Sequence, residues 1–89
     1  MKKISVVILN WNGVGMLQKF LPKVQEYSQG EGVEVCVADN GSTDESVVWL
    51  EAHCPDVRLI VLDKNYGFAD GYNKALQQVE AEYVVLLNS

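Results

Sequence analysis

The chain has 89 residues, of which 48% are hydrophobic and 21% are charged, so it is large enough for one small domain or for part of a larger one. Its net charge of −5 and its pI near 4.6 argue against nucleic acid as a partner. No apolar stretch reaches the length of a transmembrane segment. The first apolar run, residues 4–9, is too short for a signal peptide and no cleavage site follows it.

The two cysteines, Cys36 and Cys54, form no paired metal-binding motif. Two reduced thiols are typical of a cytoplasmic protein. We therefore expect a cytoplasmic protein, and peripheral association with the inner face of the membrane stays open.

The first two predicted elements are a strand and a helix. Residues 4–9 form a continuous β-branched run, which is typical of a strand buried on both faces of a parallel sheet. A helix follows to about Tyr27, and Pro22 inside it predicts a kink or a split near Leu21. The apolar stripe of this helix recurs at helical spacing, at Leu17, Phe20, Leu21 and Val24.

A second strand, residues 33–38, ends at the turn-forming sequence Asp-Asn-Gly of residues 39–41. The next residues predict a capping box, in which Ser42 and Glu45 satisfy each other's backbone N–H groups at the start of a helix. That helix is expected over residues 43–53.

The last elements are a strand over residues 57–62, a helix over residues 68–79 and a strand over residues 83–87. Glycine within a helix lowers its stability by about 1 kcal/mol relative to alanine. Gly71 therefore predicts that another group approaches the helix closely at this position. The side chains expected to face inward from this helix are Phe68, Tyr72, Ala75, Leu76 and Val79.

The resulting order, β-α-β-α-β-α-β, predicts an α/β fold with a Rossmann-like parallel sheet and helices on both faces. All strands of such a sheet end at the same edge, where ligands bind. The polar residues that follow the predicted strands are Asn10, Asp39, Asp63 with Asn65, and Asn88. The alternative is that Asn and Asp are present because they favour turns.

No motif in the sequence predicts a nucleophile with its base. The dinucleotide fingerprint, the P-loop and the nucleophile elbow are all absent, and His53 is the single histidine. Trp11, just after the first strand, offers a flat face on which a base can stack. Asp39 can accept a hydrogen bond from the imide N–H of a pyrimidine. Asp39→Asn is expected to weaken nucleotide binding less than Asp39→Ala, because the amide can rotate its carbonyl into place. The alternative for Trp11 is a hydrophobic cap on the first helix.

Four motifs resemble those of family 2 glycosyltransferases, in the same order as in that family. They are ISVVILNWNG at residues 4–13, VADNGSTD at residues 37–44, NYGFADGYN at residues 65–73 and LLNS at residues 86–89. Together they span essentially the whole chain.

This resemblance implies the N-terminal, nucleotide-sugar-binding half of a GT-A fold over residues 1–89. It further implies transfer of a sugar from a nucleotide-diphosphate donor, with inversion, in cell-wall or polysaccharide biosynthesis. The acceptor would be a glycan or a lipid-linked saccharide. The Asn-Trp-Asn-Gly sequence at residues 10–13 is similar to the rhamnosyltransferase-like branch, which implies a dTDP- or UDP-sugar.

The resemblance also implies roles for particular residues. Trp11 matches the aromatic residue that stacks on the base, with Asn10 beside it, and Asp39 matches the carboxylate that recognises the pyrimidine. Tyr72 stands where many members have an arginine, so that contact is in doubt. The residues that match the loop and helix bordering the nucleotide are Asn65, Gly67 and Asn73.

A divalent metal, Mg²⁺ or Mn²⁺, is expected for the full-length enzyme. Asn88 matches the first position of the family's metal motif, and the acidic ligand expected after Ser89 is absent from this chain. No catalytic residue is assigned here, because the base would also lie downstream. We therefore expect the isolated chain to be inactive.

Two other classes of function stay open. The first is a non-catalytic, flavodoxin-like binding or regulatory domain such as a receiver, although a receiver needs acidic residues where this chain has Asn10 and Asn12. The second is a structural piece that binds nothing alone.

Overall fold

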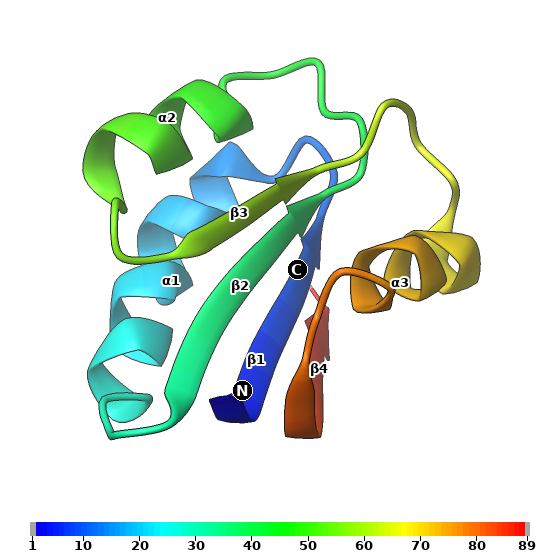
Figure 1. Cartoon of the computed structure of the whole chain (residues 1–89). Helices are drawn as coiled ribbons and strands as arrows, with labels where there is room; N and C mark the ends of the chain where they lie inside the picture. Colours follow the sequence, from blue (N-terminus) through cyan, green and yellow to red (C-terminus); the bar gives the residue numbers. More distant parts are fainter. Residues whose placement is uncertain (1, 89) are drawn as a thin grey trace.

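The computed structural model describes residues 2–88, in which strands and helices alternate (Figure 1). The elements are β1 (Lys2–Asn10), α1 (Val14–Tyr27), β2 (Val33–Asp39), α2 (Ser46–His53), β3 (Arg58–Val61), α3 (Phe68–Leu76) and β4 (Ala81–Asn88). The predicted β-α-β-α-β-α-β order is therefore confirmed, with boundaries that move by a few residues.

The four strands form one parallel sheet in the order β3-β2-β1-β4. A parallel strand pair needs a crossover connection, and each helix supplies one here. The register places Asn10 opposite Asp39, and Asp39 opposite Val61. The ends of β1, β2 and β3 therefore lie side by side along one edge, where the sequence predicted a binding crevice.

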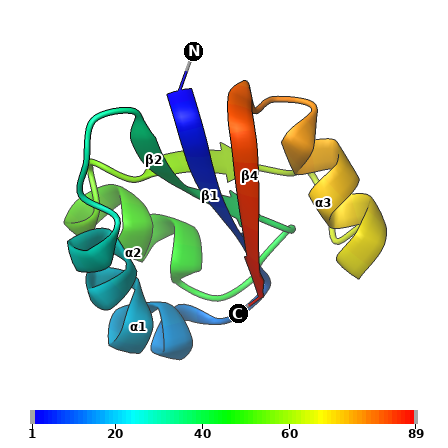
Figure 2. The ribbon, with the colours of Figure 1, turned by 90° about the horizontal axis from the view of Figure 1, so that it is seen from below.

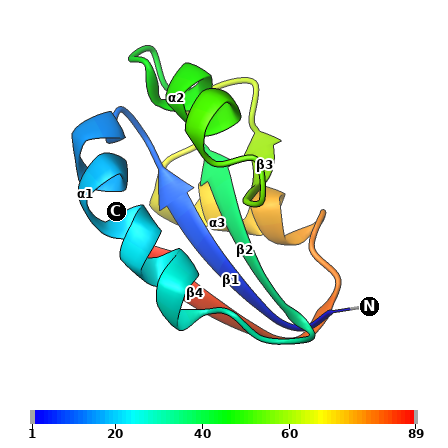
Figure 3. The ribbon, with the colours of Figure 1, turned by 90° about the vertical axis from the view of Figure 1, so that its left-hand side faces the viewer.

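Helices cover both faces of the sheet, as predicted. Figures 2 and 3 show α1 and α2 on one face and α3 on the other. β1 and β2 bury side chains on both faces, which explains why their sequences are continuously apolar. The buried residues on the α1 and α2 face are Val6, Ile8, Leu17, Leu21, Val35, Val37, Leu50, Cys54 and Val57. Those on the α3 face are Val7, Leu9, Cys36, Ala38, Ile60, Leu62, Tyr72 and Ala75.

Both cysteines are free and buried, and they belong to the cores on opposite faces of the sheet. Burial raises the pKa of the Cys36 thiol to about 11, although nearby Arg58 opposes the rise and Glu34 adds to it. Burial also raises the pKa of Cys54. The sheet separates the two thiols, so they cannot pair with each other without unfolding.

The predicted capping box is wrong. α2 begins at Ser46, three residues later than expected, and its N-cap residue Glu45 makes no side-chain capping bond. The Ser42 hydroxyl instead donates to Asp39 and accepts from the backbone of Asn12. Ser42 therefore bonds to Asp39 and Asn12 instead of to the backbone of Glu45, the partner that the sequence pattern predicted.

Two further helix predictions are corrected. α1 runs without interruption through Pro22, which lies on its exposed side, so the helix is not split. α3 ends at Leu76 rather than at residue 79, and Phe68 is 61% exposed instead of facing inward. Gly71 does have a close neighbour, because a Cβ atom there would lie 2.8 Å from Nδ2 of Asn40. The protein itself supplies that approach.

β4 is the outer strand of the sheet beside β1. Its apolar side chains are largely uncovered, unlike those of β1, and they include Tyr83, Val84, Val85 and Leu86. Within residues 2–88, no helix is both long and apolar enough to cross a membrane.

Candidate functional site

Asp39, the last residue of β2, lies at the centre of a buried hydrogen-bond network. The residue is 1% exposed. Its Oδ1 atom accepts from Nδ2 of Asn10 at 3.0 Å and from Oγ of Ser42 at 2.6 Å. Its Oδ2 atom accepts from the backbone N–H of Ser42 at 2.9 Å. Because each carboxylate oxygen can accept two hydrogen bonds, Oδ2 keeps capacity for one more donor.

Asn10 ends β1 and is fully buried beside Asp39. Its amide nitrogen also lies 3.4 Å from the Ser42 hydroxyl. The structure therefore brings together two residues that the sequence proposed for one pocket, and it adds Ser42, which the sequence analysis had assigned to a helix cap.

Trp11 follows Asn10 directly and is 54% exposed. A side chain that served as a hydrophobic cap would be mostly covered, so the exposed fraction favours a free aromatic face at this edge. The loop that contains Trp11 is tied to residues 42–44 by Asn12. The Asn12 carboxamide oxygen accepts from the backbone N–H groups of Thr43 and Asp44, at 2.7 and 3.1 Å.

Asn40 joins the end of β2 to the loop before α3. It is 3% exposed, and its Nδ2 donates to Oδ1 of Asn65 at 3.2 Å and to the carbonyl of Gly67 at 3.0 Å. Its Oδ1 accepts from the backbone N–H of Tyr66 at 3.0 Å. From the sequence alone Asn40 is a turn residue, because a pattern of turn-forming residues does not reveal which distant backbone groups a side chain will meet.

Of the three residues proposed around the third motif, Asn65 and Gly67 lie at the same edge. Asn65 Oδ1 accepts from the Gly67 N–H at 2.7 Å. Asn73 is exposed within α3, and no side-chain hydrogen bond among the described residues links it to Asp39. Tyr72, at the position of the family's arginine, is 5% exposed and donates to the carbonyl of Leu87 at 2.5 Å. It therefore packs α3 against β4.

Positive charge lies beside this edge. The ammonium groups of Lys64 and Lys74 each lie 5.1 Å from the ring centroid of Tyr66. The Tyr66 hydroxyl donates to Asp63 and lowers the pKa of that carboxyl, while the same bond raises the pKa of Tyr66. No sequence motif predicts this pair of lysines, because they are ten positions apart and meet only through the fold.

Asp44 connects this loop to the first turn of α1. Its Oδ2 accepts from the backbone N–H of Val14 at 3.2 Å, and its Oδ1 accepts from the backbone and hydroxyl of Ser46 at 2.9 and 2.5 Å. Burial raises the pKa of Asp44, but the hydrogen bonds from Ser46 and Val14 outweigh it and hold the pKa below its usual 3.8.

We expect this carboxylate to stabilise the fold above the unfolded-state pKa and to lose its effect as the pH falls through the lower folded-state pKa. The check is urea unfolding of wild type and Asp44→Asn between pH 7 and pH 2. The difference between their free energies of unfolding should be largest at neutral pH and should shrink below the usual aspartate pKa. A difference that grows on acidification would contradict the assignment.

The described residues do not fit a metal centre. Within residues 2–88, no group of three or more His, Cys, Asp or Glu side chains is placed to hold an ion. The side chain of Asn88, which the resemblance placed at the metal motif, lies outside the described part of the chain.

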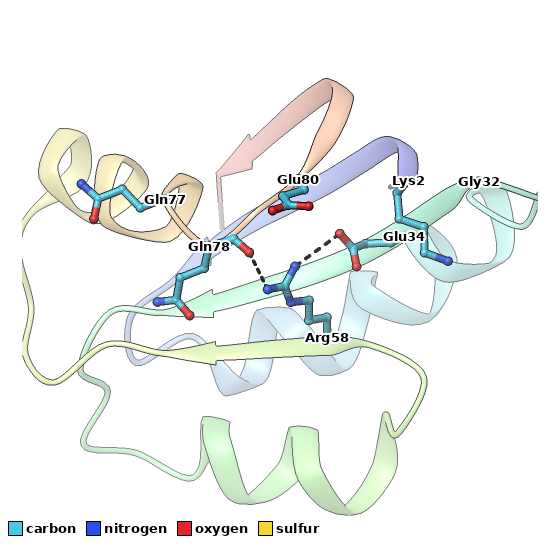
Figure 4. Close-up of a pocket in the computed structure, with 7 residues that line it drawn as sticks. All are labelled: Lys2, Gly32, Glu34, Arg58, Gln77, Gln78 and Glu80. Carbon is cyan, nitrogen blue, oxygen red and sulfur yellow. Dashed lines mark hydrogen bonds and ion pairs between the residues drawn. The ribbon is translucent and has the colours of Figure 1, made fainter.

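A cavity of about 710 Å³ lies at the opposite edge of the sheet, where the strands begin (Figure 4). Arg58 crosses it, 3.7 Å from the carboxylate of Glu34 and 2.5 Å from the carbonyl of Gln78. The lining includes two acidic and two basic side chains, and one ion pair, Arg58 with Glu34, links them. We interpret this cluster as a tie between β3 and the chain that follows α3.

The sequence and the fold of this chain are similar to those of known proteins. The chain is 34% identical, over 89 residues, to the uncharacterised glycosyltransferase YfnE of Bacillus subtilis (strain 168), covering 98% of this chain and 23% of that protein. It is similar to the structure of S. aureus TarS 1–349 in complex with UDP, with a TM-score of 0.83 and 26% identity, covering 98% of this chain and 27% of that one.

A third similar structure is the mannosyltransferase PcManGT of Pyrobaculum calidifontis in complex with GDP-Man and Mn²⁺. Its TM-score is 0.75 at 27% identity, over 97% of this chain and 27% of that one. The chain thus spans about a quarter of the length of YfnE and of the two chains in these structures. The likeness to glycosyltransferase structures confirms the expected GT-A architecture. Because the family model named Glycosyl transferase family 2 matches residues 5–89, the chain belongs to that family.

Proposed function

We propose that this chain is the donor-binding part of an inverting glycosyltransferase that uses a UDP- or dTDP-sugar. One observation supports this most strongly. The parallel register brings Asp39 and Asn10 into one buried network, and Trp11, which is 54% exposed, directly follows Asn10 in the chain. A carboxylate and an exposed aromatic residue at the same edge of the sheet suit a pyrimidine base, which needs both stacking and an acceptor for its imide N–H.

The network assigns a separate task to each oxygen of Asp39. Oδ1 is occupied by Asn10 and Ser42, which fixes the orientation of the carboxylate. Oδ2 accepts a single bond from Ser42, so it is the atom that would accept from the imide. Asp39 is 1% exposed, so only a small part of its surface is open to an incoming base. Asn65, Gly67 and Asn73 would border the nucleotide on the α3 side.

The metal, the acceptor and any membrane attachment are proposed for the full-length protein. The solved relatives named above were obtained with UDP, or with GDP-Man and Mn²⁺, which supports a nucleotide-sugar donor and a divalent metal. Asn88 stays a proposed position of the metal motif. The acceptor, a glycan or a lipid-linked saccharide, and attachment at the inner membrane face are proposals on the same basis. A flavodoxin-like regulatory domain is not favoured, because the family match spans residues 5–89.

We expect Trp11→Ala to weaken the binding of UDP by about 1–3 kcal/mol, or about 5- to 150-fold in Kd, through loss of base stacking. The loss should be similar for UDP, dTDP and ADP, because every base has a π face. Calorimetric or NMR titration of the chain measures it. Tyr27→Ala is the matched control, because Tyr27 is 85% exposed at the far end of α1. Equal affinities of wild type and Trp11→Ala for UDP would contradict the assignment of Trp11 to a base pocket.

A further inference from the structure

Asn12, the residue after Trp11, has an unusual backbone conformation. Its φ is 49°, and within residues 2–88 it is the one non-glycine residue with a positive φ. Asparagine enters this left-handed region more readily than most residues, because its short polar side chain can bond locally. Here the side chain bonds to a segment 30 or more positions away, so a preference for turns does not by itself account for it.

Asn12 clamps the Trp11 loop to residues 42–44 with groups of both the backbone and the side chain. Its N–H donates to Oγ of Ser42 at 2.8 Å, and its Oδ1 accepts from the N–H groups of Thr43 and Asp44 at 2.7 and 3.1 Å. α2 begins only at Ser46, so these two N–H groups precede the helix and need an acceptor elsewhere. Asn12 supplies that acceptor.

The same clamp extends to the carboxylate. The Ser42 hydroxyl that accepts from Asn12 donates in turn to Oδ1 of Asp39 at 2.6 Å. One continuous chain of bonds therefore runs from the residue after Trp11 to the buried acceptor, across the gap between the loops that follow β1 and β2. A clamp of this kind fixes the backbone that carries Trp11 relative to the buried carboxylate.

We propose that Asn12 is a positioning residue that holds the Trp11 loop ready for the base before any nucleotide arrives. This inference rests on the proposed function, because it assigns to Trp11 the stacking role given above. When a protein is in its binding-competent conformation for only a fraction of the time, its apparent affinity falls by that fraction. Removing the clamp therefore weakens binding through the position of the Trp11 loop, and no contact between Asn12 and the nucleotide is needed.

Two substitutions separate the backbone conformation from the hydrogen bonds. Asn12→Gly keeps the left-handed conformation and removes the acceptor. Asn12→Asp keeps an acceptor at the same place and still tolerates a positive φ. Both are made in a Trp49→Phe background, so that Trp11 is the one fluorescent tryptophan. Trp49 lies on α2 and packs against the core of the α1 and α2 face, and it makes none of the clamp's hydrogen bonds.

The first measurement needs no nucleotide. We expect Asn12→Gly to raise the acrylamide quenching of Trp11 and to lower its fluorescence anisotropy, because the ring moves more freely, while Asn12→Asp stays close to the parent. The second is the UDP titration. Asn12→Gly should raise Kd about tenfold if the competent fraction falls to about one tenth, and Asn12→Asp should stay within about threefold of the parent.

The outcomes distinguish the two proposals. If Asn12→Gly lowers the urea midpoint but leaves the quenching and anisotropy of Trp11 unchanged, Asn12 is merely structural and the inference is overturned. Equal effects of Asn12→Gly and Asn12→Asp would also overturn it, because the retained acceptor would then not matter. If Trp11→Ala binds UDP as well as the parent, the proposed base pocket fails, and with it the role of Asn12 in binding, whereas the quenching data still report whether Asn12 holds the ring.

Discussion

Gly41→Ala is expected to lower the free energy of unfolding by about 2–5 kcal/mol, which approaches the whole stability of a domain of this size, about 5–13 kcal/mol. Gly41 has a φ of +76°, where an L side chain costs about 1–2 kcal/mol. A Cβ atom there would also lie 2.5 Å from the carbonyl carbon of Lys64 and 2.6 Å from the nitrogen of Asn65. Both are backbone atoms that cannot rotate away, and overpacking of this kind adds about 1–3 kcal/mol.

Gly32→Ala is the matched control for this change. Gly32 has nearly the same φ, +79°, but the nearest atom to its Cβ position is Cβ of Lys3 at 3.4 Å, an ordinary contact. Gly32→Ala should therefore lower the free energy of unfolding only by the cost of the left-handed conformation, about 1–2 kcal/mol. Urea unfolding followed by circular dichroism measures both variants. If the two lose the same free energy, the close approach of the loops at Gly41 is not a constraint on the fold.

Asp39→Ala is expected to lower the free energy of unfolding by about 2–4 kcal/mol, independently of any ligand. The substitution removes a buried carboxylate that accepts from Asn10 and twice from Ser42. Hydrogen bonds to a charged group contribute about 1.5–3 kcal/mol each, and a buried donor left without its acceptor costs about 1–3 kcal/mol. The expected loss of about 2–4 kcal/mol is smaller than the sum of these hydrogen-bond contributions, because water can enter the space that the side chain leaves and bond to the donors.

Asp39→Asn is also expected to lower the free energy of unfolding, an effect that is separate from the smaller loss of nucleotide binding predicted from the sequence. Both oxygens of Asp39 accept hydrogen bonds, so either orientation of an amide turns its NH₂ group toward a donor. A loss of about 1–3 kcal/mol is expected from that clash of donors. The exposed Asp56 serves as control, and Asp56→Ala should stay within about 0.5 kcal/mol of wild type. Urea unfolding of the three variants without nucleotide is the measurement. An Asp39→Ala variant as stable as Asp56→Ala would contradict the network.

Much of the fold could be predicted because its signals are local. The continuous apolar runs of β1 and β2 are typical of strands buried on two faces, and the helical stripes between them require crossovers, which make the strands parallel. Parallel order then determines that Asn10 and Asp39 end at one edge. The family motifs extend the same conclusion, since they are recognised from residue identity and spacing alone.

The partners of the polar side chains were decided by the tertiary structure. Ser42 and Glu45 have the spacing of a capping box, yet Ser42 bonds to Asp39 and Asn12, because the adjacent ends of β1 and β2 present stronger acceptors and donors than the local backbone. Asn40 looked like a turn residue until the loop before α3 folded over it. The sequence by itself determined which residues reach the edge of the sheet. Only the fold decided which of their hydrogen-bonding groups are already occupied, because that depends on contacts between segments about 30 residues apart.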